Sequence, residues 1–325
     1  MKKNNILITS AGRRVSLVNS FKKELKSLGL SYKVYCTDFN PTLSSACQIS
    51  DGFFKMKKVT DKDYINDLLA LCIKNNIGLV IPTIDTELEV LSKNKELFKK
   101  NTITILVSSL DFIKSCRNKN LIHDFFDSIN FRRAKTFNSK NLIYPFFVKP
   151  YDGSRSKGAY LIEKEEHLTR EILDNDKNMF LEYFSNMDYS EFTVDIYFSN
   201  THKIKCIIPR ERIIVRDGEV NTACTRKNSI VDLVKEKFNN IEGLIGCITL
   251  QVFKSRKKDE IIGIEINPRF GGGYPLSYCA GANFPKWIIE EYLLNNFSDD
   301  YFENWNDNLL MIRYDQEIIV NGYKG

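Results

Sequence analysis

Histidine is scarce in this sequence, and its cysteines show no pairing pattern. Only 3 histidines occur in 325 residues, and they stand far apart, so a histidine-based metal site is not expected. The 8 cysteines include no Cys-x-x-Cys pair, which argues against both a zinc site and a disulfide framework. Free thiols favour a reducing compartment, and we expect a cytoplasmic protein. The cysteines occupy positions 36, 47, 72, 116, 206, 224, 247 and 279.

Long apolar runs are missing as well. No stretch approaches the length of a membrane span, and the apolar run Ile6–Ile8 is too short for the core of a signal peptide. The net charge is +6, but the lysines are spread along the chain. A nucleic-acid binder would more often gather them in a stripe with interleaved aromatic residues. We therefore expect neither a membrane nor a nucleic acid as a partner.

The common phosphate-binding motifs are also absent. The turn after the first expected strand, residues 10–14, has a single glycine and lacks the Gly-x-Gly-x-x-Gly pattern of dinucleotide-binding folds. A second glycine-containing loop, residues 151–158, is followed by a strand pattern, whereas a P-loop opens a helix. This loop, with Gly153, Ser154 and Gly158, instead predicts a flap between two strands whose backbone amides could close over phosphates. An ordinary hairpin loop is the alternative.

Strands and helices alternate over the first third of the chain. Such alternation predicts an open parallel α/β sheet, in which ligands bind beyond the carboxyl ends of the strands. The residues expected at that edge are Ser10, Gly12, Asp38, Asp85 and Glu87. We expect strands at 6–9, 32–37, 79–82 and 103–107, and helices at 14–28, 63–75 and up to residue 98.

Hairpin-forming strands dominate the remainder, which predicts an α+β organisation there. The expected domains are an N-terminal α/β domain over 1–112, a small lobe with the glycine flap over 113–184, and a large lobe over 185–325. We expect strands at 146–150, 159–162, 178–184, 191–198, 204–215, 247–254, 261–267, 309–313 and 317–320, and helices at 119–128, 165–173, 231–239 and 282–295.

The stretch 261–273 carries the most specific signal. It reads as a strand that runs into a glycine-rich loop, and strand alternation places Ile262, Ile264 and Ile266 on a core face. Gly263, Glu265 and Asn267 then share the other face, where a carboxylate and an amide oxygen could bind Mg²⁺. Arg269 adds a permanent cation beside them. Taken alone, the stretch is equally compatible with a solvated strand end and a turn.

In context, the order of these features resembles the ATP-grasp superfamily, in particular its carbamoyl-phosphate-synthase-like branch of carboxylate–amine ligases. The order is a helix-start lysine, a strand lysine, a glycine flap, the segment Glu182-Tyr183-Phe184, the segment 191–195, and finally Gln251 with Glu-x-Asn-Pro-Arg at 265–269. The resemblance implies an N-terminal open parallel α/β domain followed by a two-lobed ATP-grasp module.

The same resemblance implies roles for the matching positions. Lys119 and Lys149 would contact ATP phosphates, Glu182, Tyr183 and Phe184 would form the adenine hinge, and Glu191 would hold the ribose. Gln251, Glu265 and Asn267 would bind Mg²⁺, with Mn²⁺ as an alternative, and position 251 carries an amide where many members have a carboxylate. Arg269 would stabilise the transferred phosphoryl group, and Arg210 and Arg212 would face the substrate or its phosphate.

The expected function is therefore an ATP- and Mg²⁺-dependent ligase. It would activate a small carboxylate as an acyl phosphate and join it to an amine, such as an amino acid or amino sugar, with release of ADP and phosphate. No protein nucleophile is needed, in keeping with the absence of a Cys-His or Ser-His-Asp arrangement. A bicarbonate-phosphorylating enzyme and a non-catalytic ATP-binding module are the alternatives. The oligomeric state stays open, with a homodimer as one option.

Overall fold

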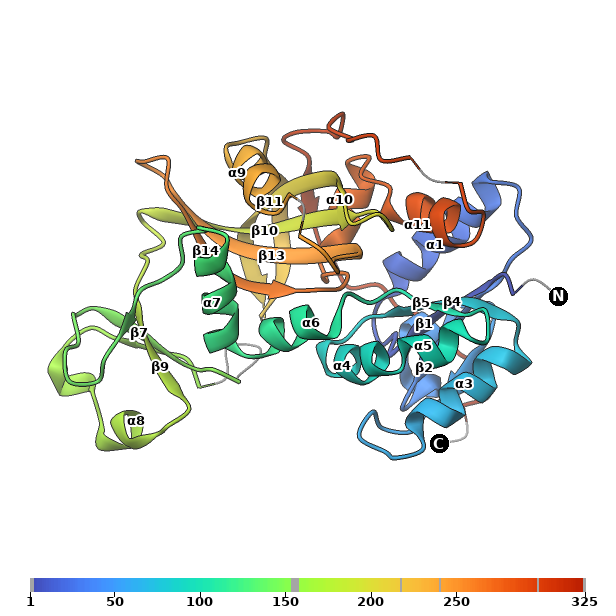
Figure 1. Ribbon diagram of the computed structural model, residues 1–325, viewed down its shortest axis with the longest axis horizontal. Helices are drawn as coiled ribbons and strands as arrows, with labels where there is room; N and C mark the ends of the chain where they lie inside the picture. The colour runs from blue at the N-terminus through green and yellow to red at the C-terminus, as the bar shows by residue number, and fades with distance from the viewer. Residues whose placement is uncertain (1–2, 153–157, 217, 240, 297, 324–325) are drawn as a thin grey trace.

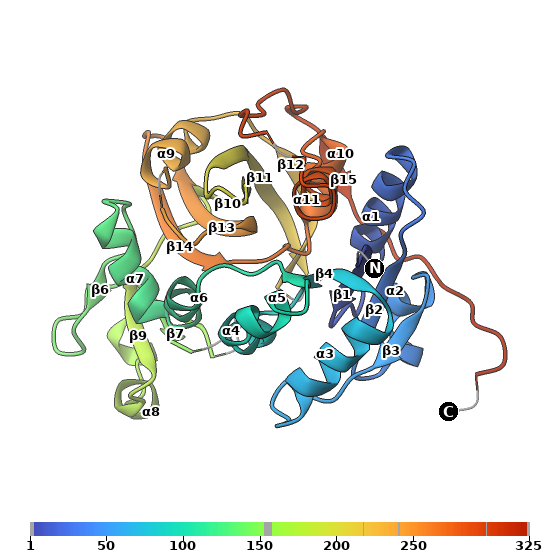
Figure 2. The ribbon, with the colours of Figure 1, turned by 45° about the vertical axis from the view of Figure 1, so that its right-hand side comes forward.

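Three β-sheets follow one another along the chain. The computed structural model describes residues 3–152, 158–216, 218–239, 241–296 and 298–323. Figures 1 and 2 place a parallel sheet at one end of the molecule, a four-stranded sheet at the other end and a six-stranded sheet between them. This mixed α/β organisation confirms the expected fold class. The expected domain boundaries at 112/113 and 184/185 stay predictions.

The first sheet is parallel throughout, with the strand order β3-β2-β1-β4-β5. The chain moves outward from β1 in one direction and then returns to β4 on its other side, so the strand order reverses between β1 and β4. Its strands are β1 (Asn5–Thr9), β2 (Val34–Asp38), β3 (Phe53–Lys55), β4 (Ile77–Pro82) and β5 (Thr104–Ile105). The accompanying helices are α1 (Val15–Ser27), η1 (Pro41–Leu43), α2 (Ser45–Gln48), α3 (Tyr64–Lys74), α4 (Asp85–Lys93) and α5 (Lys95–Lys99).

The four-stranded sheet is antiparallel, with the order β6-β9-β7-β8. Its strands are β6 (Thr136–Phe137), β7 (Phe146–Pro150), β8 (Tyr160–Ile162) and β9 (Asn178–Glu182). Two helices, α6 (Leu110–Arg117) and α7 (Lys119–Ser128), precede it, and the helix expected over 165–173 is divided into η2 (Glu165–His167) and α8 (Arg170–Asp174).

The six-stranded sheet is also antiparallel, with the order β14-β13-β10-β11-β12-β15. Its strands are β10 (Tyr189–Phe198), β11 (Ile204–Arg216), β12 (Glu219–Thr225), β13 (Gly246–Ser255), β14 (Ile261–Asn267) and β15 (Leu310–Ile312), and its helices are α9 (Ile230–Lys237), α10 (Tyr274–Cys279) and α11 (Phe284–Tyr292). The prediction of a strand over 317–320 is wrong. The segment has no strand partner, and Ile319 is 83% exposed, so neither ladder bonds nor burial stabilise a strand there.

The two faces of the six-stranded sheet pack differently. One face carries Phe192, Val194 and Ile196 into an apolar core that also includes Phe126 of α7. The residues between them on β10 point to the opposite face, which is largely polar near the centre of the sheet. The sheet therefore has one face for packing and one that can carry chemistry.

A second core joins the parallel sheet to the six-stranded sheet. It includes Phe21 of α1, Ile208 of β11 and Phe284 of α11, and the Phe21 ring meets the Phe270 ring edge-on at 6.2 Å between centroids. Both views show α1 beside α11 (Figure 1, Figure 2). The loop that contains Phe270 is thereby fixed against the N-terminal part of the chain.

Strand β14 does not alternate as expected. Gln251 pairs with Glu265 but the next residue, Val252, pairs with Gly263, so Ile264 is the extra residue of a β-bulge. The bulge reverses the alternation, and Gly263 therefore faces the packed side, where an added Cβ would lie 2.8 Å from the Phe126 ring. The expected common face for Gly263, Glu265 and Asn267 is wrong for Gly263. Glu265 and Asn267 still share a face.

Candidate active site

The polar face of the six-stranded sheet brings several of the predicted residues together. In the strand register, Thr193 of β10 lies between Arg210 of β11 and Gln251 of β13, and Gln251 lies opposite Glu265 of β14. Thr249 lies opposite Asn267 two residues further along the same strands, and therefore on the same face. Cross-strand neighbours have Cβ atoms only about 5 Å apart, so this row forms one continuous polar surface.

Glu265 and Asn267 are in direct contact. The Asn267 side-chain amide donates to Glu265 Oε1 at 3.0 Å, and Asn267 Oδ1 accepts from Arg269 Nη2 at 3.4 Å. One carboxylate with two amides fits Mg²⁺, which keeps waters and takes oxygens from substrate phosphates. The Asn267 amide would have to turn its oxygen toward the carboxylate to join it as a ligand. Across the described residues, no cluster of three or more His, Cys, Asp and Glu offers an alternative metal site.

Two lysines from the smaller lobe lie near this carboxylate. Burial lowers the pKa of Lys149, at the end of β7, to about 8; the negative charge of Glu265 opposes that shift and the positive charge of Lys119 adds to it. Burial also lowers the pKa of Lys119, with Glu265 again opposing. The backbone N–H of Lys119 donates to the carbonyl of Tyr151 at 3.1 Å, which ties the start of α7 to the loop after β7. The two lysines and Glu265 thus share one electrostatic environment.

The predicted nucleotide hinge lies at the end of β9. The Glu182 carboxylate accepts from Arg132 Nη2 at 3.3 Å, and its backbone N–H donates to the carbonyl of Lys135 at 2.9 Å. The Phe184 ring packs against Phe253 of β13, with 5.5 Å between centroids. Tyr183, between these two residues, is half-buried. Backbone groups would have to form any hydrogen bonds to a nucleotide base, because the Glu182 carboxylate already accepts hydrogen bonds from Arg132 and from the Lys135 backbone N–H.

Glu191 and Arg212 form an ion pair on the polar face. Arg212 Nη1 lies 3.4 Å from Glu191 Oε1, and burial raises the pKa of Glu191 while Arg212 opposes the shift. Arg212 Nε is buried and has no hydrogen-bond partner among the described residues. An unsatisfied buried donor is costly, which marks Arg212 as a side chain with capacity for a ligand.

Arg210 forms a buried ion pair with Asp195. Its side chain is fully buried, with Nε 2.8 Å from Asp195 Oδ2 and Nη2 3.1 Å from Asp195 Oδ1. Asp195 also accepts from Ser277 Oγ at 2.6 Å. The pair lies beneath the glycine-rich loop, with Arg210 against Gly273, and Arg210 Nη1 is buried without a hydrogen-bond partner among the described residues. That Arg210 faces a substrate stays a prediction. Sequence analysis missed Asp195 as its partner, although strand alternation places Asp195 on the same face as Glu191.

Arg269 connects the metal-binding candidates to the N-terminal sheet. Its Nη2 lies 2.6 Å from Asp85 Oδ2, at the first residue of α4, and Thr249 Oγ1 donates to its backbone carbonyl at 2.9 Å. Asp85 was expected at the ligand edge of the parallel sheet and is there. Glu87, expected at the same edge, is instead fully buried, and accepts from Thr9 Oγ1 at 2.5 Å and from the Ser10 hydroxyl.

Part of the expected flap lies outside the described residues. Gly153 and Ser154 are in that part. Gly158 is described and adopts φ +71°, a backbone conformation that favours glycine.

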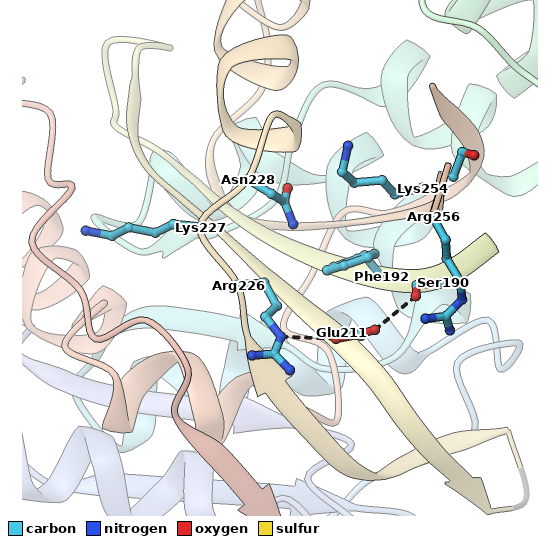
Figure 3. Close-up of a pocket in the computed structure, with 9 residues that line it drawn as sticks. Ser190, Phe192, Glu211, Arg226, Lys227, Asn228, Lys254 and Arg256 are labelled. Carbon is cyan, nitrogen blue, oxygen red and sulfur yellow. Dashed lines mark hydrogen bonds and ion pairs between the residues drawn. The ribbon is translucent and has the colours of Figure 1, made fainter. Parts of the chain in front are cut away.

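A separate pocket opens on the other face of the same sheet (Figure 3). Its volume is about 200 Å³, and Glu211 within it accepts from Ser190 Oγ at 2.9 Å and pairs with Arg226 Nε at 3.1 Å. These residues alternate with Glu191, Arg210 and Arg212, so the sheet itself separates the pocket from the polar face. The pocket is lined by Ser190, Phe192, Glu211, Arg226, Lys227, Asn228, Lys254, Ser255 and Arg256.

Family models match two successive parts of the chain. Residues 6–106 match "PylC-like, N-terminal domain", and residues 176–315 match "ATP-grasp in the biosynthetic pathway with Ter operon". The chain therefore belongs to the ATP-grasp superfamily, as the order of its motifs indicated. No curated protein matches it in sequence.

Solved structures resemble the chain over most of its length. N5-carboxyaminoimidazole synthetase from Staphylococcus aureus, solved with ADP, has a TM-score of 0.70 at 18% identity, over 93% of this chain and 81% of its own. Biotin carboxylase from Campylobacter jejuni has a TM-score of 0.71 at 13% identity, over 94% and 74%. L-amino acid ligase from Bacillus licheniformis has a TM-score of 0.66 at 16% identity, over 90% and 75%. At such identities the likeness establishes the shared fold.

The helices carry no membrane signal. Among the described residues, none combines the length and the apolar character needed to cross a bilayer.

Proposed function

We propose that this protein is an ATP- and Mg²⁺-dependent ligase that phosphorylates a small carboxylate and joins the resulting acyl group to an amine. The observation that carries the proposal is the convergence of Lys119 and Lys149 on Glu265, beside Gln251, Asn267 and Arg269. The solved relatives support the nucleotide, since the Staphylococcus aureus synthetase was solved with ADP and the Campylobacter jejuni biotin carboxylase as a β-γ-ATP complex. The free state of all 8 cysteines supports a reducing, cytoplasmic location.

The chemistry requires an anionic carboxylate to approach an anionic γ-phosphate. Mg²⁺, when bound, would neutralise phosphate charge. Lys119 and Lys149 would hold the phosphates from the side of the smaller lobe, and Glu265, Asn267 and Gln251 would hold the metal from the sheet. Arg269, held in place by its ion pair with Asp85, would stabilise the negative charge that develops on the transferred phosphoryl group.

Water must be kept away from an acyl phosphate. We assign this task to the loop between β7 and β8, which includes Gly153, Ser154 and Gly158. The hinge Glu182-Tyr183-Phe184 would receive the adenine through backbone groups, and Glu191 would receive the ribose hydroxyls. Arg212 would contribute its unsatisfied Nε to a phosphate or to the acid.

The first test is turnover in the presence of hydroxylamine, which traps acyl phosphates as hydroxamates. Wild-type protein with ATP, Mg²⁺ and pools of small carboxylic acids is expected to release ADP and form a hydroxamate. ADP release that depends on bicarbonate alone would favour the carbamoyl-phosphate-type alternative. Nucleotide binding without turnover on broad acid pools would favour a non-catalytic module, for which the amide at position 251 is the supporting feature.

The second test is substitution of the proposed metal ligand. Glu265→Ala should lower turnover by at least about a hundredfold, because it removes the only carboxylate of the proposed set. Glu236→Ala is the matched control, since Glu236 is 69% exposed on the surface of α9. Circular dichroism and thermal unfolding should show both variants folded. Wild-type turnover in folded Glu265→Ala would remove Glu265 from the metal role.

A further inference from the structure

Three guanidinium groups meet where the N-terminal sheet faces the glycine-rich loop after β14. We call Arg14, Arg269 and Arg313 the arginine cluster. Arg313 donates from Nη2 to the carbonyl of Gly272, and an added Cβ on Gly272 would lie 3.4 Å from Arg14 Nη1. Arg14 is close enough to Arg269 and to Arg313 for their charges to interact.

The positive charge of the cluster exceeds its negative charge. Asp85 pairs with Arg269 at 2.6 Å, and Glu219 pairs with Arg313 at 3.4 Å. Arg14 has no carboxylate within salt-bridge distance in the part of the chain that the structure describes, and its hydrogen bond to the Thr83 carbonyl is 3.5 Å long. Burial lowers the pKa of Arg14 to about 10; repulsion from Arg269 and Arg313 adds to this shift, and attraction to Glu219 and Asp85 opposes it.

Such an arrangement is costly for the protein alone. A desolvated guanidinium beside two others is disfavoured unless an anion compensates it. Arg269 Nε is also buried and has no hydrogen-bond partner among the described residues. The neighbouring Glu219–Arg313 pair is half-exposed, so an incoming anion could replace it at little cost. Planar guanidinium groups are suited to bidentate contact with carboxylate or phosphate.

The position of the arginine cluster in the fold also favours a ligand-binding role. Arg14 follows the loop after β1, and Asp85 follows β4. Strands β1 and β4 are neighbours in the parallel sheet, and the strand order reverses between them. Ligands of open α/β sheets bind outside the carboxyl ends of the strands at this kind of switch point.

We infer that the arginine cluster binds an anionic group, a carboxylate or a phosphate, that belongs to a substrate and does not itself react. The inference rests on the proposed function and names a substrate class for it. The acid or amine bound against the N-terminal sheet is a molecule with an additional acidic group. Arg14 and Arg313 hold that group, while Arg269 faces the reacting end.

The test is anion binding to the full-length protein with its nucleotide site filled. Isothermal titration calorimetry would measure inorganic phosphate, and in a second series malonate, against protein saturated with AMP-PNP and Mg²⁺. Arg14→Gln and Arg313→Gln should each raise the dissociation constant by at least about tenfold. Arg226→Gln, in the pocket on the other face of the sheet, should leave it unchanged. Tighter phosphate binding would indicate a phosphorylated substrate, and tighter malonate binding a carboxylated one.

Two results would overturn the inference. One is that neither anion binds the wild-type protein, and the other is that binding is unaffected in both arginine variants or is lost in Arg226→Gln alone. AMP-PNP binding is measured separately in every variant. If the wild-type protein binds no AMP-PNP, the proposed function fails, whereas anion titration without nucleotide still reports on the cluster.

Discussion

At the scale of single residues, burial decides what a charged side chain can do here. Arg210 and Arg212 are two positions apart on β11 and look equivalent in sequence. Arg210 is fully buried and pairs with Asp195, whereas Arg212 pairs with the partly exposed Glu191. Arg210 Nη1 and Arg212 Nε are both buried without a hydrogen-bond partner among the described residues. Glu87 and Asp85 differ in the same way at the start of α4. Within each pair, the adjacent charges therefore differ in how deeply they and their partners are buried.

Removing Arg210 should destabilise the fold strongly. Arg210→Met leaves Asp195 buried without its cation, and breaking such a pair costs about 3–5 kcal/mol of unfolding free energy. Lys93→Met is the control, because Lys93 and Glu89 form an exposed pair worth about 0.5 kcal/mol. Urea denaturation followed by fluorescence measures both. Equal stabilities for the two variants would contradict a structural role for Arg210.

Glu87 should make stability depend on pH. Burial raises its pKa to about 7, above the ordinary value of 4.5. The protonated form is therefore favoured in the folded state, and its contribution is complete below the unfolded pKa and is lost as pH rises through about 7. The unfolding free energy should fall between these values by at most about 3 kcal/mol. Glu87→Gln should flatten that decline.

The matched variant for this experiment is Glu89→Gln. Glu89 is on the same helix, but it is exposed and paired with Lys93, which lowers its pKa. It should keep the wild-type slope of unfolding free energy against pH. If Glu87→Gln keeps that slope too, Glu87 does not titrate in this range.

At the scale of elements, the packing of strand β14 beside the metal candidates requires glycine at a position where a larger residue would not fit. The bulge at Ile264 turns Gly263 into the packed face, against Phe126 of α7. Alternation alone cannot reveal a bulge, because a bulge is a property of the pairing between two strands. Strand β14 itself could be predicted from its apolar residues. Its partner register could not.

Gly263→Ala should therefore strain the contact between β14 and α7. The added Cβ would lie 2.8 Å from the Phe126 ring, and such overpacking costs about 1–3 kcal/mol. Phe126→Leu should relieve part of this cost, so the double variant should be more stable than the sum of the two single changes predicts. Additive losses in thermal and urea unfolding would show that the two side chains do not meet.

At the scale of the whole molecule, the three sheets differ in how much apolar core they share with one another. Phe21 of α1 lies in a core shared with the six-stranded sheet, whereas Phe146 of β7 lies in a small core confined to the four-stranded sheet and its flanking segments. The shared core holds the N-terminal sheet against the glycine-rich loop. This is the geometry that the arginine cluster needs, since its members come from both parts.

Truncation of Phe21 should consequently loosen two sheets together. Phe21→Ala removes a fully buried ring and should cost about 3–5 kcal/mol. Hydrogen exchange should accelerate both in β1 and in β10. Phe146→Ala is the matched change and should accelerate exchange mainly in β7–β9. If Phe21→Ala accelerates hydrogen exchange only in β1–β5, the two sheets are stabilised independently.

The sequence by itself determined the fold class, the superfamily and most strands, because these follow from local periodicity and from the order of short motifs. It also placed Glu265, Asn267 and Arg269 next to one another, since they are neighbours in the chain. Tertiary structure alone decided that Arg210 is sealed by Asp195 and that Arg14 and Arg313 meet at Gly272. Such contacts join residues far apart in the chain, and burial and charge balance arise only after the sheets have packed.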